Sequence, residues 1–233
     1  MNYFEDYFYK NTKRPIRKWR HYFEIYEKHF CKFKNKTVNF LEIGVGHGGS
    51  LQMWKGYFDS NSKIIGLDIS TECKNYEEEQ IEIEIGSQFD ISTLEKLVSK
   101  YNNFDIVVDD GSHINEHMIF TFNYLFKHLN EDGVYLIEDI HTSYYEDFGG
   151  GFKKEGSIME FTKQKLDQIN KFYIDYGGAS DDYFTKYLNN ISIYDGIIVF
   201  EKKFRKTKPI SLYSSGDGNF PESNPSENIN LDM

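Results

Sequence analysis

The sequence predicts an α/β fold, with a mostly parallel seven-stranded Rossmann-like sheet, helices on both faces and an antiparallel hairpin at its C-terminal end. Two observations predict it. Short, nearly all-apolar segments alternate with longer segments whose apolar residues recur at helical spacing, which is typical of a buried parallel sheet. Near the end of the chain, Asp195-Gly196 stands between two apolar-rich segments and predicts a two-residue hairpin turn.

The strands and helices can be placed in order along the chain. The strands are short and rich in Ile, Val, Leu or Phe, and we place them at residues 38–43, 63–68, 81–85, 104–108, 134–137, 191–194 and 197–200. Apolar residues at helical spacing predict helices over residues 15–33, 51–57, 91–101 and 114–129. The aromatic face of the first helix, which includes Trp19 and Phe30, would pack against the sheet or another subunit.

Composition divides the chain into three parts. A helical extension over residues 1–35 precedes one domain over residues 36–206, and a polar tail over residues 207–233 is expected to be disordered. Within the domain, residues 141–190 break the alternation of strands and helices, with Gly149-Gly150-Gly151 as a hinge. This segment follows the carboxyl end of a strand, where open α/β sheets bind ligands, so we expect it to form a substrate lid.

Length and charge exclude several classes of protein. A chain of 233 residues with a net charge of −10 suits one α/β domain and disfavours general nucleic-acid binding. The two cysteines, Cys31 and Cys73, form no CxxC motif, and no apolar run approaches the length of a membrane span. We therefore expect a protein of the reducing cytoplasm without a membrane span, with assembly into a homo-oligomer left open.

One basic run stands out against the acidic composition. It lies near the N-terminus and comprises Lys13, Arg14, Arg17, Lys18 and Arg20. Two interpretations are open: a solvated helix face, or a patch that binds an anionic substrate or partner.

A glycine-rich turn joins the first strand of the predicted sheet to a helix. Gly44, Gly46 and Gly49 satisfy the G-x-G-x-x-G pattern, which lets a ligand approach the backbone and the N–H groups of the helix start. Asp68 ends the next strand, 24 positions after Gly44, where a carboxylate can bind both ribose hydroxyls of a cofactor. The pattern therefore predicts an adenosine-containing cofactor and leaves NAD and S-adenosylmethionine (SAM) both open.

Acidic residues follow the next two strands of the sheet. Asp109-Asp110 ends the fourth strand and Glu138-Asp139 the fifth, so neighbouring strand ends gather Asp110, Glu138 and Asp139 around one point. Carboxylates so close repel unless a cation joins them, and oxygen ligands suit Mg²⁺; the alternative for each aspartate alone is a helix cap. His113 follows closely, and an imidazole ordinarily titrates near neutral pH, so this side chain is a candidate general base.

Four motifs together resemble a known family. They are HYFEIYE at residues 21–27, LEIGVGHGGSLQMW at 41–54, DDGSH at 109–113 and IEDIHTSY at 137–144. The chain resembles, over about residues 17–203, the metal-dependent class I SAM O-methyltransferases typified by mycinamicin-type macrolide-sugar methyltransferases. It is similar as well to cephalosporin-hydroxylase-like proteins and to bacterial capsule-sugar methyltransferases.

The resemblance implies a SAM methyltransferase fold and assigns roles to residues of this chain. Asp110, Glu138 and Asp139 would be the Mg²⁺ ligands, and His113, beside the metal-bound Asp110, would be the catalytic base. The SAM pocket would be formed by Glu42, Gly44, Gly46, Ser50, Asp68, Gln88 and Asp109. The family's usual Gly-Asp-Gln after the third strand is Gly86-Ser87-Gln88 here, which changes the contacts expected to adenine.

The resulting hypothesis is a SAM-dependent, Mg²⁺-dependent O-methyltransferase acting on a sugar hydroxyl. By the same resemblance, the acceptor would be a nucleotide-linked sugar, such as a heptose, in bacterial capsule or surface polysaccharide synthesis. Three alternatives remain open: an N-methyltransferase of a small amine such as phosphoethanolamine, an NAD-linked oxidoreductase, and a non-catalytic SAM-binding scaffold. Indifference to chelation would favour the amine, whereas the cluster of acids and His113 argues against the scaffold.

Overall fold

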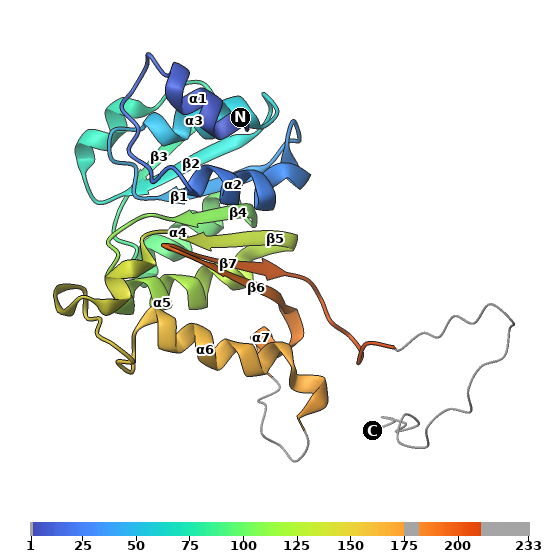
Figure 1. Ribbon diagram of the computed structural model, residues 1–233. Coiled ribbons are helices and arrows are strands. Elements are labelled where there is room, and N and C mark those ends of the chain that lie inside the picture. The colour runs from blue at the N-terminus through green and yellow to red at the C-terminus, as the bar shows by residue number, and fades with distance from the viewer. Residues whose placement is uncertain (1, 175–181, 211–233) are drawn as a thin grey trace, which may run out of the picture.

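The computed structural model describes residues 2–174 and 182–210 of the chain. Within these residues the sheet has seven strands in the order β3-β2-β1-β4-β5-β7-β6 (Figure 1). Strands β1 to β5 are parallel, and β7 pairs antiparallel with both β5 and β6. The predicted fold class is therefore confirmed, including the C-terminal hairpin that turns at Asp195-Gly196.

Most elements lie where they were predicted, but the helix predicted over residues 114–129 ends at Leu125, and β5, predicted at residues 134–137, already begins at Leu129. The strands are β1 Asn39–Ile43, β2 Lys63–Asp68, β3 Ile81–Ile85, β4 Phe104–Asp109, β5 Leu129–Ile137, β6 Leu188–Tyr194 and β7 Ile197–Lys202. The α-helices are α1 Tyr3–Lys10, α2 Tyr22–Phe30, α3 Gly49–Tyr57, α4 Ile91–Tyr101, α5 Asn115–Leu125, α6 Ile158–Ile169 and α7 Tyr183–Tyr187. Short 3₁₀ turns span Cys31–Phe33, Thr71–Tyr76, Phe126–His128, Ile140–Tyr144, Glu146–Phe148 and Lys171–Tyr173.

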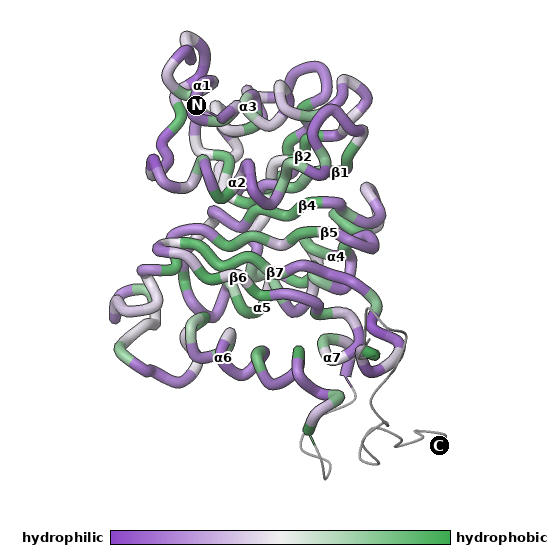
Figure 2. The backbone as a smooth tube through the Cα atoms, turned by 45° about the vertical axis from the view of Figure 1, so that its right-hand side comes forward, coloured by the Kyte–Doolittle hydropathy of each residue, from purple (hydrophilic) through white to green (hydrophobic). Residues whose placement is uncertain are grey.

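The sheet separates two hydrophobic layers. Alternate residues of each strand point to opposite faces, so Phe40 packs with α1, α2 and α3, whereas Leu41 packs with the layer formed by α4 to α7. In the first layer, Phe4 and Trp54 are fully buried with ring centroids 5.3 Å apart. Figure 2 shows the apolar strands between these more polar helical layers. Burial of apolar surface on both faces is the main stabilising contribution to such a sheet.

The first predicted helix is shorter than expected. The prediction covered residues 15–33, but α2 begins at Tyr22, and residues 11–21 form a non-helical segment that we call the N-terminal strap. Pro15 excludes helix only before residue 15, so the course of the remaining residues follows from their contacts, with Lys18 bound to Asp110 and Trp19 to Asp139. A glycine at position 49 lets the strap cross the start of α3, because a Cβ atom there would lie 2.2 Å from the Pro15 carbonyl oxygen.

The segment expected to be a lid is partly built into the fold. Helix α6 buries Ile158 and Thr162 and packs in the same hydrophobic layer as α5. The lid role stays a prediction, and residues 175–181 of that segment lie outside the described residues, as do residues 211–233 of the expected tail. In the described part of the chain, no helix is long and apolar enough to cross a membrane.

Candidate functional site

A cavity of about 680 Å³ opens at the carboxyl ends of the parallel strands. The register places these ends level with one another, because Ile43 pairs with Leu67 and Asp109, and Asp109 pairs with Ile137. Each strand therefore delivers its following turn to the same edge of the sheet. This edge is where open parallel sheets bind ligands.

The glycine turn after β1 forms one wall of the cavity. Gly44 and Gly46 both line it, with φ of +89° and +54°. The Asp68 carboxylate accepts hydrogen bonds from the backbone N–H groups of Val45 at 2.8 Å and Gly46 at 3.3 Å. Asp68 and Ser50 also line the cavity, so four of the predicted cofactor-binding residues face one space.

A side chain at Gly44 should destabilise the fold more than a side chain at Gly46. A Cβ at Gly44 would lie 2.0 Å from the Asp110 carbonyl oxygen, whereas a Cβ at Gly46 would meet nothing within 4 Å. We expect Gly44→Ala to lower the free energy of unfolding by about 3 kcal/mol or more and Gly46→Ala by about 1–2 kcal/mol, the cost of a left-handed alanine. Urea unfolding of both variants measures this difference, and equal losses would contradict the packing described here.

The other predicted cofactor residues lie beneath the cavity and do not line it. Glu42 is fully buried and accepts a hydrogen bond from the Ser50 hydroxyl at 2.7 Å, and burial raises the pKa of Glu42 to about 7. Gln88 donates to Asp109 at 3.0 Å and accepts from the backbone N–H of Ser112 at 2.8 Å. Burial likewise raises the pKa of Asp109 to about 6, against the opposing hydrogen bond from Gln88. These contacts fix the turn that carries the acidic motif after β4.

Asp110, His113 and Asp139 form a compact group that also lines the cavity. One ligand atom from each lies within 4.8 Å of the others, and His113 Nε2 is 3.8 Å from both Asp110 Oδ1 and Asp139 Oδ2. The Nδ1 atom of His113 is buried without a hydrogen-bond partner among the described residues. Carboxylate oxygens are the ligands that Mg²⁺ prefers, so Asp110 and Asp139 fit this metal, while the imidazole between them is not a ligand that Mg²⁺ requires.

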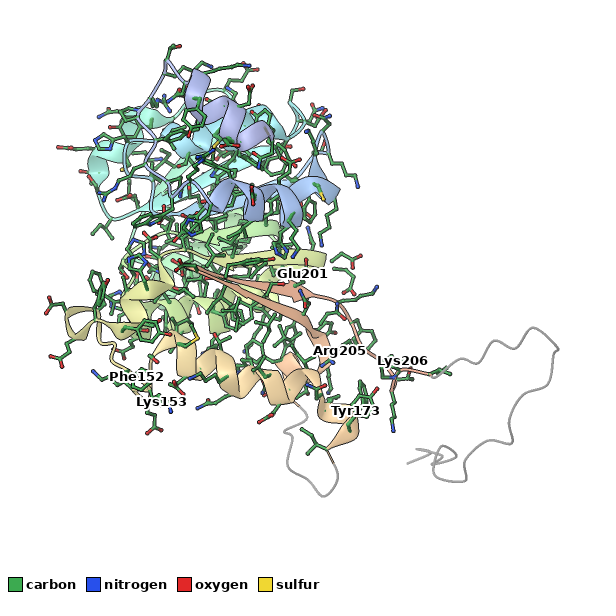
Figure 3. The ribbon with its side chains drawn as sticks, viewed as in Figure 1. Phe152, Lys153, Tyr173, Glu201, Arg205 and Lys206 are labelled. Carbon is green, nitrogen blue, oxygen red and sulfur yellow. The ribbon has the colours of Figure 1, made fainter. Side chains whose placement is uncertain are left out.

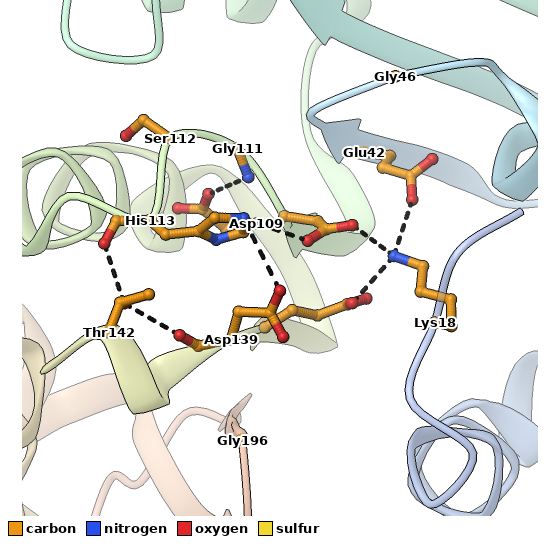
Figure 4. Close-up of polar contacts among 12 residues, drawn as sticks. Lys18, Glu42, Gly46, Asp109, Gly111, Ser112, His113, Asp139, Thr142 and Gly196 are labelled. Carbon is orange, nitrogen blue, oxygen red and sulfur yellow. Dashed lines mark hydrogen bonds and ion pairs between the residues drawn. The ribbon is translucent and has the colours of Figure 1, made fainter. Parts of the chain in front are cut away.

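The backbone at this group is held in an uncommon conformation. His113 and Asp139 have φ of +57° and +53°, in the left-handed region that non-glycine residues rarely adopt. The Thr142 hydroxyl lies 3.0 Å from the carbonyl oxygens of both residues (Figure 4). Thr142 therefore ties the two left-handed turns together, a role that nothing in the sequence pattern indicates.

Lys18 is the functional residue that the sequence interpretation missed. Its ammonium group lies 2.6 Å from Asp110, 2.9 Å from Glu138 and 3.7 Å from Glu42 (Figure 4), and its side chain is 3% exposed. Although burial lowers the pKa of Lys18, these carboxylates raise it well above its ordinary value. The interpretation of the basic run as a solvated helix face is therefore wrong in two respects: residues 11–21 are not helical, and Lys18 is buried, although Lys13, Arg17 and Arg20 are exposed.

Glu138 lies outside the compact group, although it was predicted with it. Its two oxygens accept hydrogen bonds from Tyr26 at 2.7 Å and Lys18 at 2.9 Å. Burial raises the pKa of Glu138 to about 8; the nearby Asp110 adds to this rise and Lys18 opposes it. Glu138 lines the cavity beside Asp139, so its role as a third metal ligand stays a prediction.

The strap and the first residue of α2 also contact the third predicted metal ligand. Trp19 Nε1 and the Tyr22 hydroxyl donate to the same oxygen of Asp139, at 3.1 and 2.7 Å. Each acidic residue of the predicted metal site thus has a partner from residues 18–26. The strap therefore completes the wall of the cavity, although it lies about a hundred positions from the acidic residues in the sequence.

Comparison with known proteins finds O-methyltransferases among the relatives of this chain. No protein-family model matches the chain. Demethylmacrocin O-methyltransferase from Streptomyces fradiae is 38% identical over 189 residues, which cover 76% of this chain and 47% of the relative. Mycinamicin VI 2''-O-methyltransferase from Micromonospora griseorubida is 35% identical over 188 residues, with the same two coverages.

A solved structure shares the fold. The MycE methyltransferase of mycinamycin biosynthesis, in complex with Mg, SAH and mycinamycin VI, superimposes with a TM-score of 0.78 at 31% identity. The match covers 92% of this chain and 56% of that one. The chain therefore spans about half the length of the relatives that it matches.

Proposed function

The chain is a homologue of macrolide- and tetracenomycin-sugar O-methyltransferases, and from this premise we propose that it transfers a methyl group from SAM to a sugar hydroxyl with the help of Mg²⁺. One observation carries the proposal beyond resemblance. The glycine turn with Asp68 and the group Asp110, His113 and Asp139 line a single cavity, and Gly44 packs against the backbone of Asp110. A cofactor and a metal-held acceptor would thus meet in one space.

The residues of this chain have distinct roles in the proposed reaction. Gly44, Gly46 and Asp68 would hold SAM, and Asp110 and Asp139, with Glu138 as a predicted third ligand, would hold Mg²⁺. A bound Mg²⁺ would lower the pKa of the acceptor hydroxyl. His113 Nε2 faces the cavity between the two aspartates and would accept the hydroxyl proton. The cavity walls would align the acceptor oxygen with the methyl group of SAM, and such alignment can supply much of an enzyme's rate enhancement.

A finer proposal concerns the acceptor. We propose a nucleotide-linked sugar, such as a heptose, made for a bacterial capsule or surface polysaccharide in the cytoplasm. The resemblance to capsule-sugar methyltransferases supports it. So does Arg17, an exposed residue that lines the cavity and has no charged partner among the described residues, since a guanidinium suits a diphosphate.

Metal removal tests the proposed function directly. We expect EDTA to lower methyl transfer to a sugar by about 100-fold or more and Mg²⁺ to restore it, because an unactivated hydroxyl is a weak nucleophile. Calorimetric titration with SAH should show binding in EDTA as well, since the glycine turn needs no metal. Full activity in EDTA with an amine acceptor would replace this proposal by N-methylation.

A further inference from the structure

Trp19 exposes a large aromatic surface inside the cavity. Its side chain lines the cavity, and the residue is 54% exposed, an unusual position for the largest apolar side chain. Other exposed rings, such as Phe152 and Tyr173, lie on outer segments next to α6 (Figure 3) and do not line it. The exposure of Trp19 therefore needs a reason specific to the site.

The indole is held at a fixed place next to the acidic group. Its Nε1 donates to Asp139 at 3.1 Å, and the centroid of its ring lies 6.2 Å from that of His141, with an interplanar angle of 83°. His141 continues the aromatic surface to Tyr145, whose ring centroid is 5.8 Å away. The hydrogen bond at Nε1 and the neighbouring His141 ring restrict the indole, so its face is already positioned before a ligand binds.

We propose that the face of Trp19 is the platform on which the sugar ring of the acceptor stacks. This inference rests on the proposed function and names how that site recognises a pyranose. The C–H groups on one face of a pyranose carry partial positive charge, and the face of an indole is electronegative, so the two attract while apolar surface is buried. The anchor to Asp139 places this platform beside the carboxylates that would orient the hydroxyls.

Intrinsic fluorescence can report on this contact. The chain has two tryptophans, and Trp54 is fully buried in the layer beside β1, so Trp19 is the one exposed to a ligand. Protein saturated with SAH and Mg²⁺ is titrated with methyl α-L-rhamnopyranoside, a neutral glycoside, and with GDP-mannose, a nucleotide-linked sugar. Glycerol serves as a polyol that lacks a ring face. With excitation selective for tryptophan over the 18 tyrosines, we expect a saturable change in emission with at least one sugar, none with glycerol, and none in Trp19→Phe, where Trp54 is the remaining tryptophan.

Two variants separate the ring from its N–H group. Trp19→Ala should raise KM for the methylated sugar by about tenfold, with a smaller effect on kcat. Trp19→Phe keeps a ring but loses the N–H group, and it should recover most of that rise in KM. Circular dichroism confirms that each variant folds. An equal rise of KM in both variants would assign the effect to the hydrogen bond to Asp139 and overturn the stacking inference.

The outcomes distinguish this inference from the proposed function. Methyl transfer to a sugar with no change in Trp19 emission would overturn the platform and leave the methyltransferase intact. A saturable change without methyl transfer would support the platform and count against the proposed reaction. A change in Trp19 emission with methyl α-L-rhamnopyranoside would indicate a neutral glycoside as the acceptor, and a change with GDP-mannose would indicate a nucleotide-linked sugar.

Discussion

His113→Ala is expected to lower kcat for sugar methylation by about 10²- to 10⁴-fold, the usual range for one general base. His113 Nε2 lies 3.8 Å from both Asp110 and Asp139, so it would sit beside an acceptor hydroxyl held by those residues. Binding of SAH should change little, because Gly44, Gly46 and Asp68, which would hold the cofactor, are unchanged in this variant. Single-turnover kinetics with SAM, combined with calorimetry with SAH, measures the two effects separately.

His117→Ala is the matched control for this prediction. His117 belongs to the same stretch of chain, but its ring stacks on Phe89 and contacts the Ser112 hydroxyl, and it does not line the cavity. We expect its kcat to stay within about threefold of wild type. If His113→Ala kept full activity, or if both variants lost activity equally, the base would have to be another group and the proposed mechanism would fail.

The sequence was sufficient for the sheet because its signals are local. Strands such as β4 are apolar on both faces, and Asp195-Gly196 encodes its turn in two residues. The acidic group followed from the same pattern. Parallel strands bring their carboxyl ends to one edge, so the turns after β4 and β5 had to carry Asp110 and Asp139 together.

The strap could not be predicted because its interactions are not local. Lys18 is 92 residues from Asp110 and 120 from Glu138, and nothing in the spacing of the basic run distinguishes it from its neighbours. The helical spacing of aromatic residues correctly predicted α2. The same spacing extends into the strap, where contacts with the site outweigh helix propensity. Trp19 therefore looked like a packing residue, although its ring faces the cavity.

Lys18→Met is expected to lower the free energy of unfolding at pH 8.5 by about 3–5 kcal/mol, the usual loss when one partner of a buried ion pair is removed. The variant leaves Glu42 and Glu138, both fully buried, without the ammonium that lies among them. Lys10→Met is the matched control, since Lys10 pairs with Asp6 at 2.7 Å but on the surface, where the loss should be at most about 0.5 kcal/mol. Urea unfolding measures both variants.

The pH dependence of this loss has a definite sign. Burial raises the pKa of Glu42 to about 7 and of Glu138 to about 8, so each favours folding at low pH, and that contribution is lost as pH rises through these values. Lys18 offsets the loss by stabilising the ionised carboxylates. The difference in the free energy of unfolding between wild type and Lys18→Met should therefore be small at pH 5.5, where both glutamates are protonated in both proteins, and should grow toward pH 8.5.

Mg²⁺ should raise the stability of the variant more than that of wild type, because a bound cation would neutralise the carboxylates in place of Lys18. A difference independent of pH, with no extra gain from Mg²⁺, would show that Lys18 acts by packing the strap and that the buried carboxylates need no cation.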